Sequence, residues 1–197
     1  MTQIPIPGII LAAGRSLRMG KNKLLLSFHG KPILQHVLDT AQQSSLSPLI
    51  LVLGSKSDLV QAQITPGRVI IVENPSFLCG YGSSLQVGLK ALSEPCAGAM
   101  FLLGDQPLLI TKTINRLILA FQEEPERWVA PSWSGLRGNP VIIPVSWFDR
   151  IFALKGDTGP REHLSDPAAN LKLVDVDDRG VVLDIDTPED YEQLKKI

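Results

Sequence analysis

The sequence has only two cysteines, no long apolar run and almost no net charge, and each scarcity excludes a class of protein. Cys79 and Cys96 do not have the spacing of metal ligands. The apolar run at residues 46–53 is broken by Ser47 and Pro48 and is too short to cross a bilayer. A net charge of −1 argues against a nucleic-acid binder, which needs a broad excess of lysine and arginine. We expect small-molecule or protein partners, with no nucleic acid and no membrane.

Histidine is also scarce. His29, His36 and His163 are scattered, and no Ser-His-Asp or Cys-His order stands out, so we expect no covalent nucleophile. The first residues, 1–5, lack the charged and apolar regions of a signal peptide. We therefore expect a cytoplasmic protein in which both thiols are reduced.

The 197 residues are 44% hydrophobic, which is enough for one domain with its own core. Apolar runs typical of buried strands alternate with segments whose apolar residues recur at helical spacing. The predicted strands are 8–12, 49–53, 69–72, 97–103 and 128–130, and the predicted helices begin at Pro32, near Leu59, before Leu85 and at Thr111, which would cap its helix. Right-handed crossovers would join these strands into a mostly parallel sheet with helices on both faces. Ligands of such α/β sheets gather at the carboxyl ends of the strands.

The segment that follows the first strand combines glycines with cations and contains no predicted regular structure. Gly14 and Gly20 lack side chains at positions where the backbone can approach a ligand closely. The cations are Arg15, Arg18, Lys21 and Lys23. We expect a polyphosphate ligand. The loop is not a Walker A loop, because its glycines are one residue too far apart and Asn22 follows Lys21 where that loop has a hydroxyl residue.

Asp105 comes directly after the apolar run 97–103 and a glycine, so its carboxylate is held at the edge of the sheet. Magnesium prefers hard oxygen ligands and usually takes one or two protein carboxylates together with substrate phosphates. Asp105 is a candidate first ligand, and Asp184 or Asp186 is a candidate second. Both of the latter also suit the start of the helix that Thr187 and Pro188 predict.

The glycines at 80 and 82 suggest a different function, because G-x-G-x-x-G marks dinucleotide sites. The third glycine is absent, and the preceding strand ends near Val72, which leaves a long loop where that motif needs a tight turn. We therefore reject a dinucleotide site.

The last third of the chain changes character. It contains a predicted short strand at 141–144, a turn-rich loop at 156–160 and a half-exposed strand at 171–176. We expect an appended lobe that could hold a second substrate. The loops around Arg137 and Arg161 each place an arginine on a glycine-rich backbone, a geometry that suits a phosphorylated ligand. As isolated loops, however, they are more typical of solvated turns.

Six motifs together resemble those of the nucleotidyltransferases related to molybdenum cofactor cytidylyltransferase. They are L-A-A-G-x-S-x-R-M-G-x-x-K-L at 11–24, G-x-x-S-S-L at 80–85, G-D-x-P at 104–107, G-x-R-G-[HN]-P at 135–140, G-D-x-G-[AP]-R at 156–161 and D-x-[DN]-T-P-E-[DE] at 184–190. The resemblance covers nearly the whole chain in the order of the family. It implies a single nucleotidyltransferase domain over residues 1–197, with a nucleotide-binding part at about 1–131 and an acceptor-binding part at about 132–183. The implied fold is a Rossmann-like three-layer sandwich, similar to the nucleotide-diphospho-sugar transferases.

The resemblance also implies a reaction, in which CMP passes from CTP to the phosphate of molybdopterin and pyrophosphate is released. The implied catalytic residues are Arg18, Lys23 and Asp105; the nucleotide-binding residues are Leu11, Ala12, Ala13, Gly14, Arg15, Ser16, Gly82, Ser83 and Ser84; the ligands of Mg²⁺ are Asp105 and Asp186; and the acceptor-binding residues are Arg137, Gly138, Asn139, Asp157 and Arg161. Asn139 stands where histidine is commoner in the family.

Three alternatives stay open. Ala13 favours CTP, since guanylyltransferase relatives usually have L-A-G-G there, but transfer of GMP or of another NMP remains possible. The phosphorylated acceptor could be a different small molecule. The chain could also be a non-catalytic nucleotide-binding chaperone that hands a cofactor to a molybdoenzyme, and a client molybdoenzyme or its chaperone is a possible partner of the enzyme as well.

Overall fold

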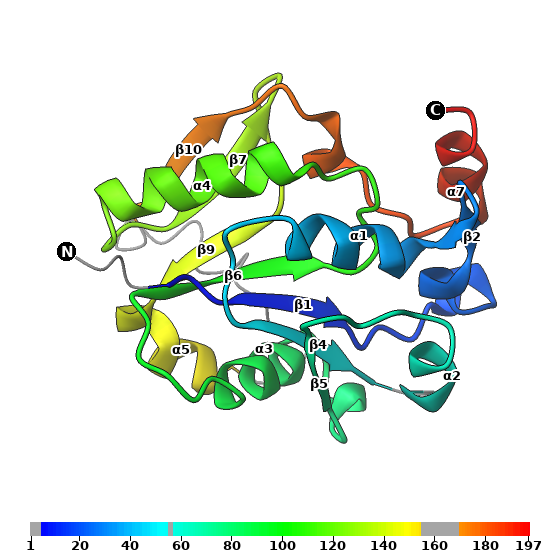
Figure 1. Ribbon diagram of the computed structural model, residues 1–197, viewed down its shortest axis with the longest axis horizontal. Coiled ribbons are helices and arrows are strands. Elements are labelled where there is room, and N and C mark those ends of the chain that lie inside the picture. The colour runs from blue at the N-terminus through cyan, green and yellow to red at the C-terminus, as the bar shows by residue number, and fades with distance from the viewer. Residues whose placement is uncertain (1–4, 55–56, 155–169) are drawn as a thin grey trace.

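The computed structural model describes residues 5–54, 57–154 and 170–197. Asp157, Arg161 and the turn-rich loop at 156–160 lie outside these residues. One large sheet runs through the molecule in the order β10-β7-β9-β6-β1-β4-β5 (Figure 1). Its strands are β1 Gly8–Ala12, β4 Leu49–Leu53, β5 Ile70–Glu73, β6 Gly98–Leu103, β7 Val129–Trp133, β9 Val141–Pro144 and β10 Lys172–Asp175, and β8 Leu136–Arg137 pairs with β7. β2 Ser27–Phe28 and β3 Lys31–Pro32 form a separate small hairpin.

The sheet is mostly parallel, as predicted. β1 runs parallel to both β4 and β6, β4 runs parallel to β5, and β10 runs parallel to β7. β9 is antiparallel to β6 and β7, and β8 is antiparallel to β7. The prediction of an appended lobe is wrong in this respect, because β9 lies inside the main sheet between β6 and β7.

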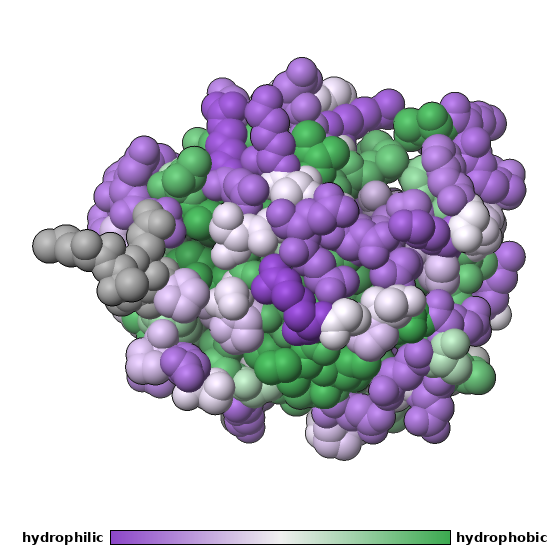
Figure 2. All heavy atoms as spheres, viewed as in Figure 1, coloured by the Kyte–Doolittle hydropathy of each residue, from purple (hydrophilic) through white to green (hydrophobic). Residues whose placement is uncertain are grey.

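Helices cover both faces of the sheet and make three layers (Figure 1). The helices are α1 Ile33–Gln42, α2 Ser57–Gln61, α3 Tyr81–Lys90, α4 Thr111–Glu123, α5 Phe148–Phe152 and α7 Pro188–Leu194. Side chains of β1 alternate between two cores: Ile10 packs in the core with α1 and α4, and Ile9 packs in the core with α3 and α5. The outer surface of α1 and α4 is largely hydrophilic (Figure 2). The predicted α/β three-layer sandwich is therefore confirmed.

The start of α4 differs from the prediction. Thr111 is not the N-cap; Ile110 occupies that position. The hydroxyl of Thr111 donates to the carbonyl of Thr40 (3.2 Å). The buried carboxylate of Asp178 instead accepts from the N–H of Ile110 (3.1 Å) and the hydroxyl of Thr113 (2.6 Å). A distant side chain thus satisfies the donors at this helix end. At α7 the prediction is confirmed, since Thr187 and Asp190 form a capping box.

The path of the chain creates a crevice beside β1. From β1 the chain moves through α1 to β4 and β5, and then returns to β6 on the other side of β1. Ligands of open α/β sheets bind where the strand order reverses in this way, outside the carboxyl ends of the strands. The glycine-rich loop follows β1 and Asp105 follows β6, so both lie at this crevice. Among the described residues no helix is long and apolar enough to span a membrane.

Candidate active site

The loop after β1 is more ordered than the sequence suggested. It contains two short 3-10 helices, η1 Leu17–Met19 and η2 Lys23–Leu25. Ser16 has a left-handed backbone (φ 53°), and its hydroxyl accepts from the backbone N–H of Lys23 (3.3 Å). The side chain of Asn22 accepts from the N–H of Leu24 (3.1 Å) and caps η2. These bonds close the loop on itself and fix the direction in which the side chain of Lys23 leaves it.

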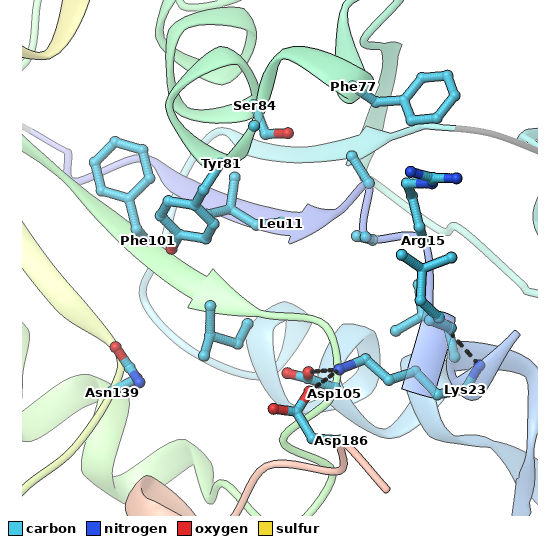
Figure 3. Close-up of a pocket in the computed structure, with 18 of the residues that line it drawn as sticks. Leu11, Arg15, Lys23, Phe77, Tyr81, Ser84, Phe101, Asp105, Asn139 and Asp186 are labelled. Atoms are coloured by element: carbon cyan, nitrogen blue, oxygen red, sulfur yellow. Dashed lines mark hydrogen bonds and ion pairs between the residues drawn. The ribbon is translucent and has the colours of Figure 1, made fainter. Parts of the chain in front are cut away.

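Lys23 lies between two carboxylates that come from distant parts of the chain (Figure 3). Its ammonium donates to Oδ2 of Asp105 (2.5 Å) and to Oδ1 of Asp186 (2.8 Å). The side chains of Lys23 and Asp105 are only 13% and 14% exposed, so this ion pair is largely removed from water. The structure therefore brings together three of the predicted site residues.

Arg18 completes the cluster from the solvent side. Its guanidinium donates to Oδ2 of Asp186 (2.7 Å), and its side chain is 68% exposed. An ion pair this exposed stabilises a fold by only about 0–1 kcal/mol. Arg18 can therefore exchange Asp186 for an anionic ligand at little cost in stability. Arg15 also lines the crevice, but its side chain points away from Asp105 and Asp186 (Figure 3).

Burial is the largest influence on the pKa values of the cluster, and the neighbouring charges decide the net direction. Burial lowers the pKa of Lys23, but Asp105 and Asp186 outweigh this effect and hold it above its usual value. Burial raises the pKa of Asp186, but Lys23 and Arg18 bring it below its usual value. Burial also raises the pKa of Asp105, and here Lys23 does not fully offset the effect, to which the charge of Asp184 adds. Additional positive charge would therefore favour the ionised form of Asp105.

The donor set fits a divalent metal of the magnesium type. Asp105 and Asp186 offer carboxylate oxygens that already converge on one cation, the ammonium of Lys23. In the described part of the chain no group of three or more His, Cys, Asp or Glu side chains could hold a metal. Two carboxylates suffice for Mg²⁺, which keeps waters and takes further oxygens from substrate phosphates. Asp184 is not among the lining residues, so the geometry favours Asp186 as the second ligand.

A cavity of about 770 Å³ extends from this cluster along the end of the sheet. The predicted site residues that line it are Leu11, Ala12, Ala13, Gly14, Arg15, Ser16, Arg18, Lys23, Ser84, Asp105, Arg137, Asn139 and Asp186. One end of the cavity thus carries the charged cluster. Apolar side chains from β6 and β9, including Phe101 and Ile143, form part of its wall. Neither these two residues nor Tyr81, the first residue of α3, was predicted from the sequence. Tyr81 lies at an unspecified position of the G-x-x-S-S-L motif, and the two apolar residues gave no signal beyond their place in predicted strands.

The turn at the start of α3 contributes less to the cavity than expected. Ser84 lines it, but Gly82 and Ser83 are not among the lining residues. The hydroxyl of Ser83 donates toward the carbonyls of Gly80 (2.7 Å) and Ser76 (3.0 Å). The side-chain amide of Asn74 donates to the hydroxyls of Ser83 (2.8 Å) and Ser84 (3.0 Å). Ser83 therefore holds the turn together, and Asn74, which the sequence analysis missed, buttresses it.

The loop from β8 to β9 supplies the predicted acceptor-binding residues of the described chain. Arg137 and Asn139 line the cavity. Gly138 does not, and a side chain there would collide with the backbone of Val181. The N–H of Asn139 donates to the carbonyl of Val181 (2.8 Å). Gly138 therefore lets the loop lie against residue 181, which fixes where Asn139 projects.

Two known proteins are similar to this chain over nearly its whole length. The purine catabolism protein PucB of Bacillus subtilis (strain 168) is 32% identical over 198 aligned residues, which cover 96% of this chain and 95% of that protein. The molybdenum cofactor cytidylyltransferase of Escherichia coli (strain K12) is 29% identical over 191 residues, with 95% and 94% coverage.

Solved structures show the same architecture. Rv0371c from Mycobacterium tuberculosis H37Rv superposes with a TM-score of 0.89 at 29% identity and full coverage of both chains. A structure of Rv0371C in complex with manganese superposes with a TM-score of 0.83 at 29% identity, over 98% of each chain. The family model of the MobA-like NTP transferase domain matches residues 8–173. The chain therefore belongs to the family of MobA-like NTP transferase domains and is a nucleotidyltransferase by family.

Proposed function

We propose that this protein transfers CMP from CTP to the phosphate of a molybdopterin-type acceptor. A phosphate oxygen of the acceptor attacks the α-phosphorus of CTP, the bond from that phosphorus to the β-phosphate bridge breaks, and pyrophosphate leaves. The observation that carries the proposal is the cluster of Arg18, Lys23, Asp105 and Asp186 at one end of a cavity large enough for two substrates. Cations for a triphosphate and carboxylates for a metal are the parts that such a reaction requires.

The residues of the charged end act by positioning and by charge. Arg18 and Lys23, with backbone N–H groups between Gly14 and Arg18, hold the triphosphate. Asp105 and Asp186 hold Mg²⁺, which when bound neutralises charge that develops on the phosphate oxygens. No protein nucleophile takes part, because the acceptor supplies the attacking oxygen. Catalysis then consists of alignment and electrostatic stabilisation.

The base lies at the start of the loop in this proposal, near Leu11, Ala12 and Ala13, with the turn at Gly82–Ser84 beside it. The methyl group of Ala13 takes up space that glycine would leave to a purine, which favours CTP over GTP. One methyl group contributes only about 1–3 kcal/mol of discrimination. Backbone hydrogen bonds near Ser84, which lines the cavity, therefore supply the rest.

The acceptor lies at the other end of the cavity. Arg137 and Asn139 face it there, supported by Gly138, and Asp157 and Arg161 are further proposed contacts in the part of the chain outside the described residues. The molybdopterin-type acceptor follows from the E. coli relative, which is a molybdenum cofactor cytidylyltransferase by name. The proposed setting is the cytoplasm, with a client molybdoenzyme or its chaperone as the recipient of the product.

The direct test is release of pyrophosphate from an equal mixture of CTP and GTP with Mg²⁺ and molybdopterin. We expect the cytosine dinucleotide to exceed the guanine dinucleotide, and we expect no release without the acceptor. An excess of the guanine product would overturn the preference for CTP and leave nucleotidyl transfer standing. Binding of nucleotide without any release would favour the non-catalytic chaperone.

A second candidate is transfer of an NMP to a different small phosphorylated acceptor. It is favoured by the relative PucB, which is named for purine catabolism and covers as much of the chain as the E. coli protein does. Release of pyrophosphate with another phosphorylated acceptor, but not with molybdopterin, would support this candidate.

A further inference from the structure

The ammonium of Lys23 occupies the point on which the two metal-binding carboxylates converge. It donates to Oδ2 of Asp105 (2.5 Å) and to Oδ1 of Asp186 (2.8 Å). Figure 3 shows the lysine stem reaching from η2 directly to these two carboxylates. A metal ion bound by the same oxygens would need this position. Lys23 and a metal therefore compete for one place.

A metal that arrives alone meets an obstacle in this arrangement. The metal would have to displace the ammonium of Lys23, whose side chain is only 13% exposed. This ammonium is also held by two carboxylates, Asp105 and Asp186. The displaced ammonium would lose both carboxylates as partners, and it would remain close enough to repel the incoming cation. Binding of free metal is therefore opposed by Lys23.

A nucleotide removes the obstacle. Lys23 lines the cavity and sits on a flexible four-carbon stem, so its ammonium can turn toward a triphosphate bound at the loop. The triphosphate then replaces both partners that Lys23 gives up, and it adds oxygen ligands for the metal. Nucleotide and metal should therefore bind with strong positive coupling.

We propose that Lys23 is a specificity-determining residue which makes the pair Asp105–Asp186 selective for a metal that a nucleotide carries, and which excludes free metal. This inference rests on the proposed function, because it uses the triphosphate and metal roles of the same cluster. The inference adds an exchange of partners to that function. Lys23 stabilises the two carboxylates before the nucleotide and metal bind, and the metal takes the place of Lys23 on the carboxylate oxygens afterwards.

The test measures Mn²⁺ affinity, from the electron paramagnetic resonance signal of free Mn²⁺, with and without a non-hydrolysable CTP analogue. The wild-type protein should bind Mn²⁺ weakly alone and at least about 5-fold more tightly with the analogue, the lower end of typical coupling between sites. Lys23→Met should bind Mn²⁺ alone at least about 5-fold more tightly than the wild type, with a smaller effect of the analogue. Lys31→Met is the matched control, because it removes the same charge from an exposed pair with Asp39 and should leave Mn²⁺ affinity unchanged.

Two further variants keep the inference falsifiable. Lys23→Gln should reproduce the gain if the methionine variant folds poorly, and a melting curve establishes folding for each protein. Adding Asp186→Asn to Lys23→Met should abolish the gain in Mn²⁺ affinity, because it removes one of the two carboxylates. Folded Lys23 variants that bind Mn²⁺ alone no more tightly than the wild type would overturn the inference. That result would leave pyrophosphate release untouched, whereas failure of pyrophosphate release would not alter the affinities for metal alone.

Discussion

Asp105 is held in a position that suits binding of a cation better than it suits stability. Its pKa lies above the usual value because burial penalises the charged form more than Lys23 favours it. A carboxyl group whose folded pKa is raised makes folding less favourable when it is ionised at neutral pH. Replacing the carboxylate by an amide of the same shape removes this penalty. Lys23 still keeps Asp186 as a charged partner.

Asp105→Asn should therefore separate activity from stability. We expect pyrophosphate release to fall by about 10²-fold or more, because a charge that acts on the transition state is lost. We expect the melting temperature to change little, because the variant removes the burial penalty of the Asp105 charge but also removes one of the two charged partners of the buried Lys23. Asp39→Asn is the control, since it removes a half-buried carboxylate that pairs with Lys31 away from the cavity, and its turnover should be normal. Near-normal turnover of Asp105→Asn, or a large drop in its melting temperature, would contradict the assignment.

At the scale of elements, the segment η6 Arg179–Val182 ties the parts of the site together. The carbonyl of Val181 accepts from the N–H of Asn139 (2.8 Å) and from the side chain of Gln106 (3.2 Å), the residue after Asp105. A few residues later, the N–H of Ile185 donates to the carbonyl of Asp105 (3.3 Å). One segment thus sets the relative position of Asp105 and the proposed acceptor loop.

Gly138→Ala tests this connection. The new Cβ would lie 2.7 Å from the carbonyl carbon of Val181, so the loop of Arg137 and Asn139 must shift. We expect a loss of about 1–3 kcal/mol in the free energy of unfolding, typical of overpacking. We also expect the KM for the acceptor to rise more than the KM for CTP, because the loop that must shift carries Arg137 and Asn139, whereas the charged end is connected to it only through Val181. Denaturant unfolding and steady-state kinetics measure both effects, and an increase in the KM for CTP alone would contradict the proposed division of the cavity.

The sequence predicted the elements well wherever local pattern decides the structure. The run 49–53 is β4, and Thr187 with Pro188 starts α7, because apolar periodicity and capping act over a few residues. Prediction failed where a distant residue decides. Thr111 did not become the cap of α4, because Asp178 reaches that helix end from 65 or more residues away in the chain. The place of β9 inside the sheet likewise depends on pairing with β6 and β7, which no local pattern encodes.

The candidate site shows the same division. The family motifs predicted which residues form the charged cluster. The structure does bring together Arg18, Lys23, Asp105 and Asp186. Their pairing could not be predicted, because Lys23 and Asp186 are 163 residues apart and meet only when the sheet is formed. The supporting role of Asn74 was equally hidden, since it depends on the fold of the turn before α3.

The carboxyl groups with shifted pKa values together predict how the stability of the protein responds to acid. The pKa values of Asp39, Asp186 and Asp190 lie below their usual range; in each, burial acts to raise the value, but hydrogen bonds and nearby charges outweigh it. The pKa of Glu124 is lowered to about 2 by its hydrogen bonds to Arg127 and Lys172. Asp105 is shifted in the opposite direction. The response of the protein's stability to pH is the sum of the effects of all these shifts.

A carboxyl group with a lowered folded pKa binds fewer protons in the native state than in the unfolded state between the two pKa values. The stability that it contributes is therefore present above about pH 4.5, the usual range of Asp and Glu, and is lost as the pH falls toward the folded pKa. Asp105, whose pKa is raised, has the reverse effect on stability, but the four carboxyl groups with lowered pKa values oppose it. We expect the melting temperature to fall steadily from about pH 4.5 to about pH 2.

Glu124→Gln isolates one contribution to this acid response. The variant lacks the carboxyl group, so the wild type should be the more stable protein at pH 7, and the difference should shrink below about pH 4.5 as Glu124 becomes protonated. The two proteins should converge near pH 2, where the pKa of Glu124 lies in the folded protein. Melting curves of both proteins at intervals from pH 7 to pH 2 measure the difference directly. A difference that stays constant over this range would mean that Arg127 and Lys172 do not stabilise the charged form of Glu124 in solution.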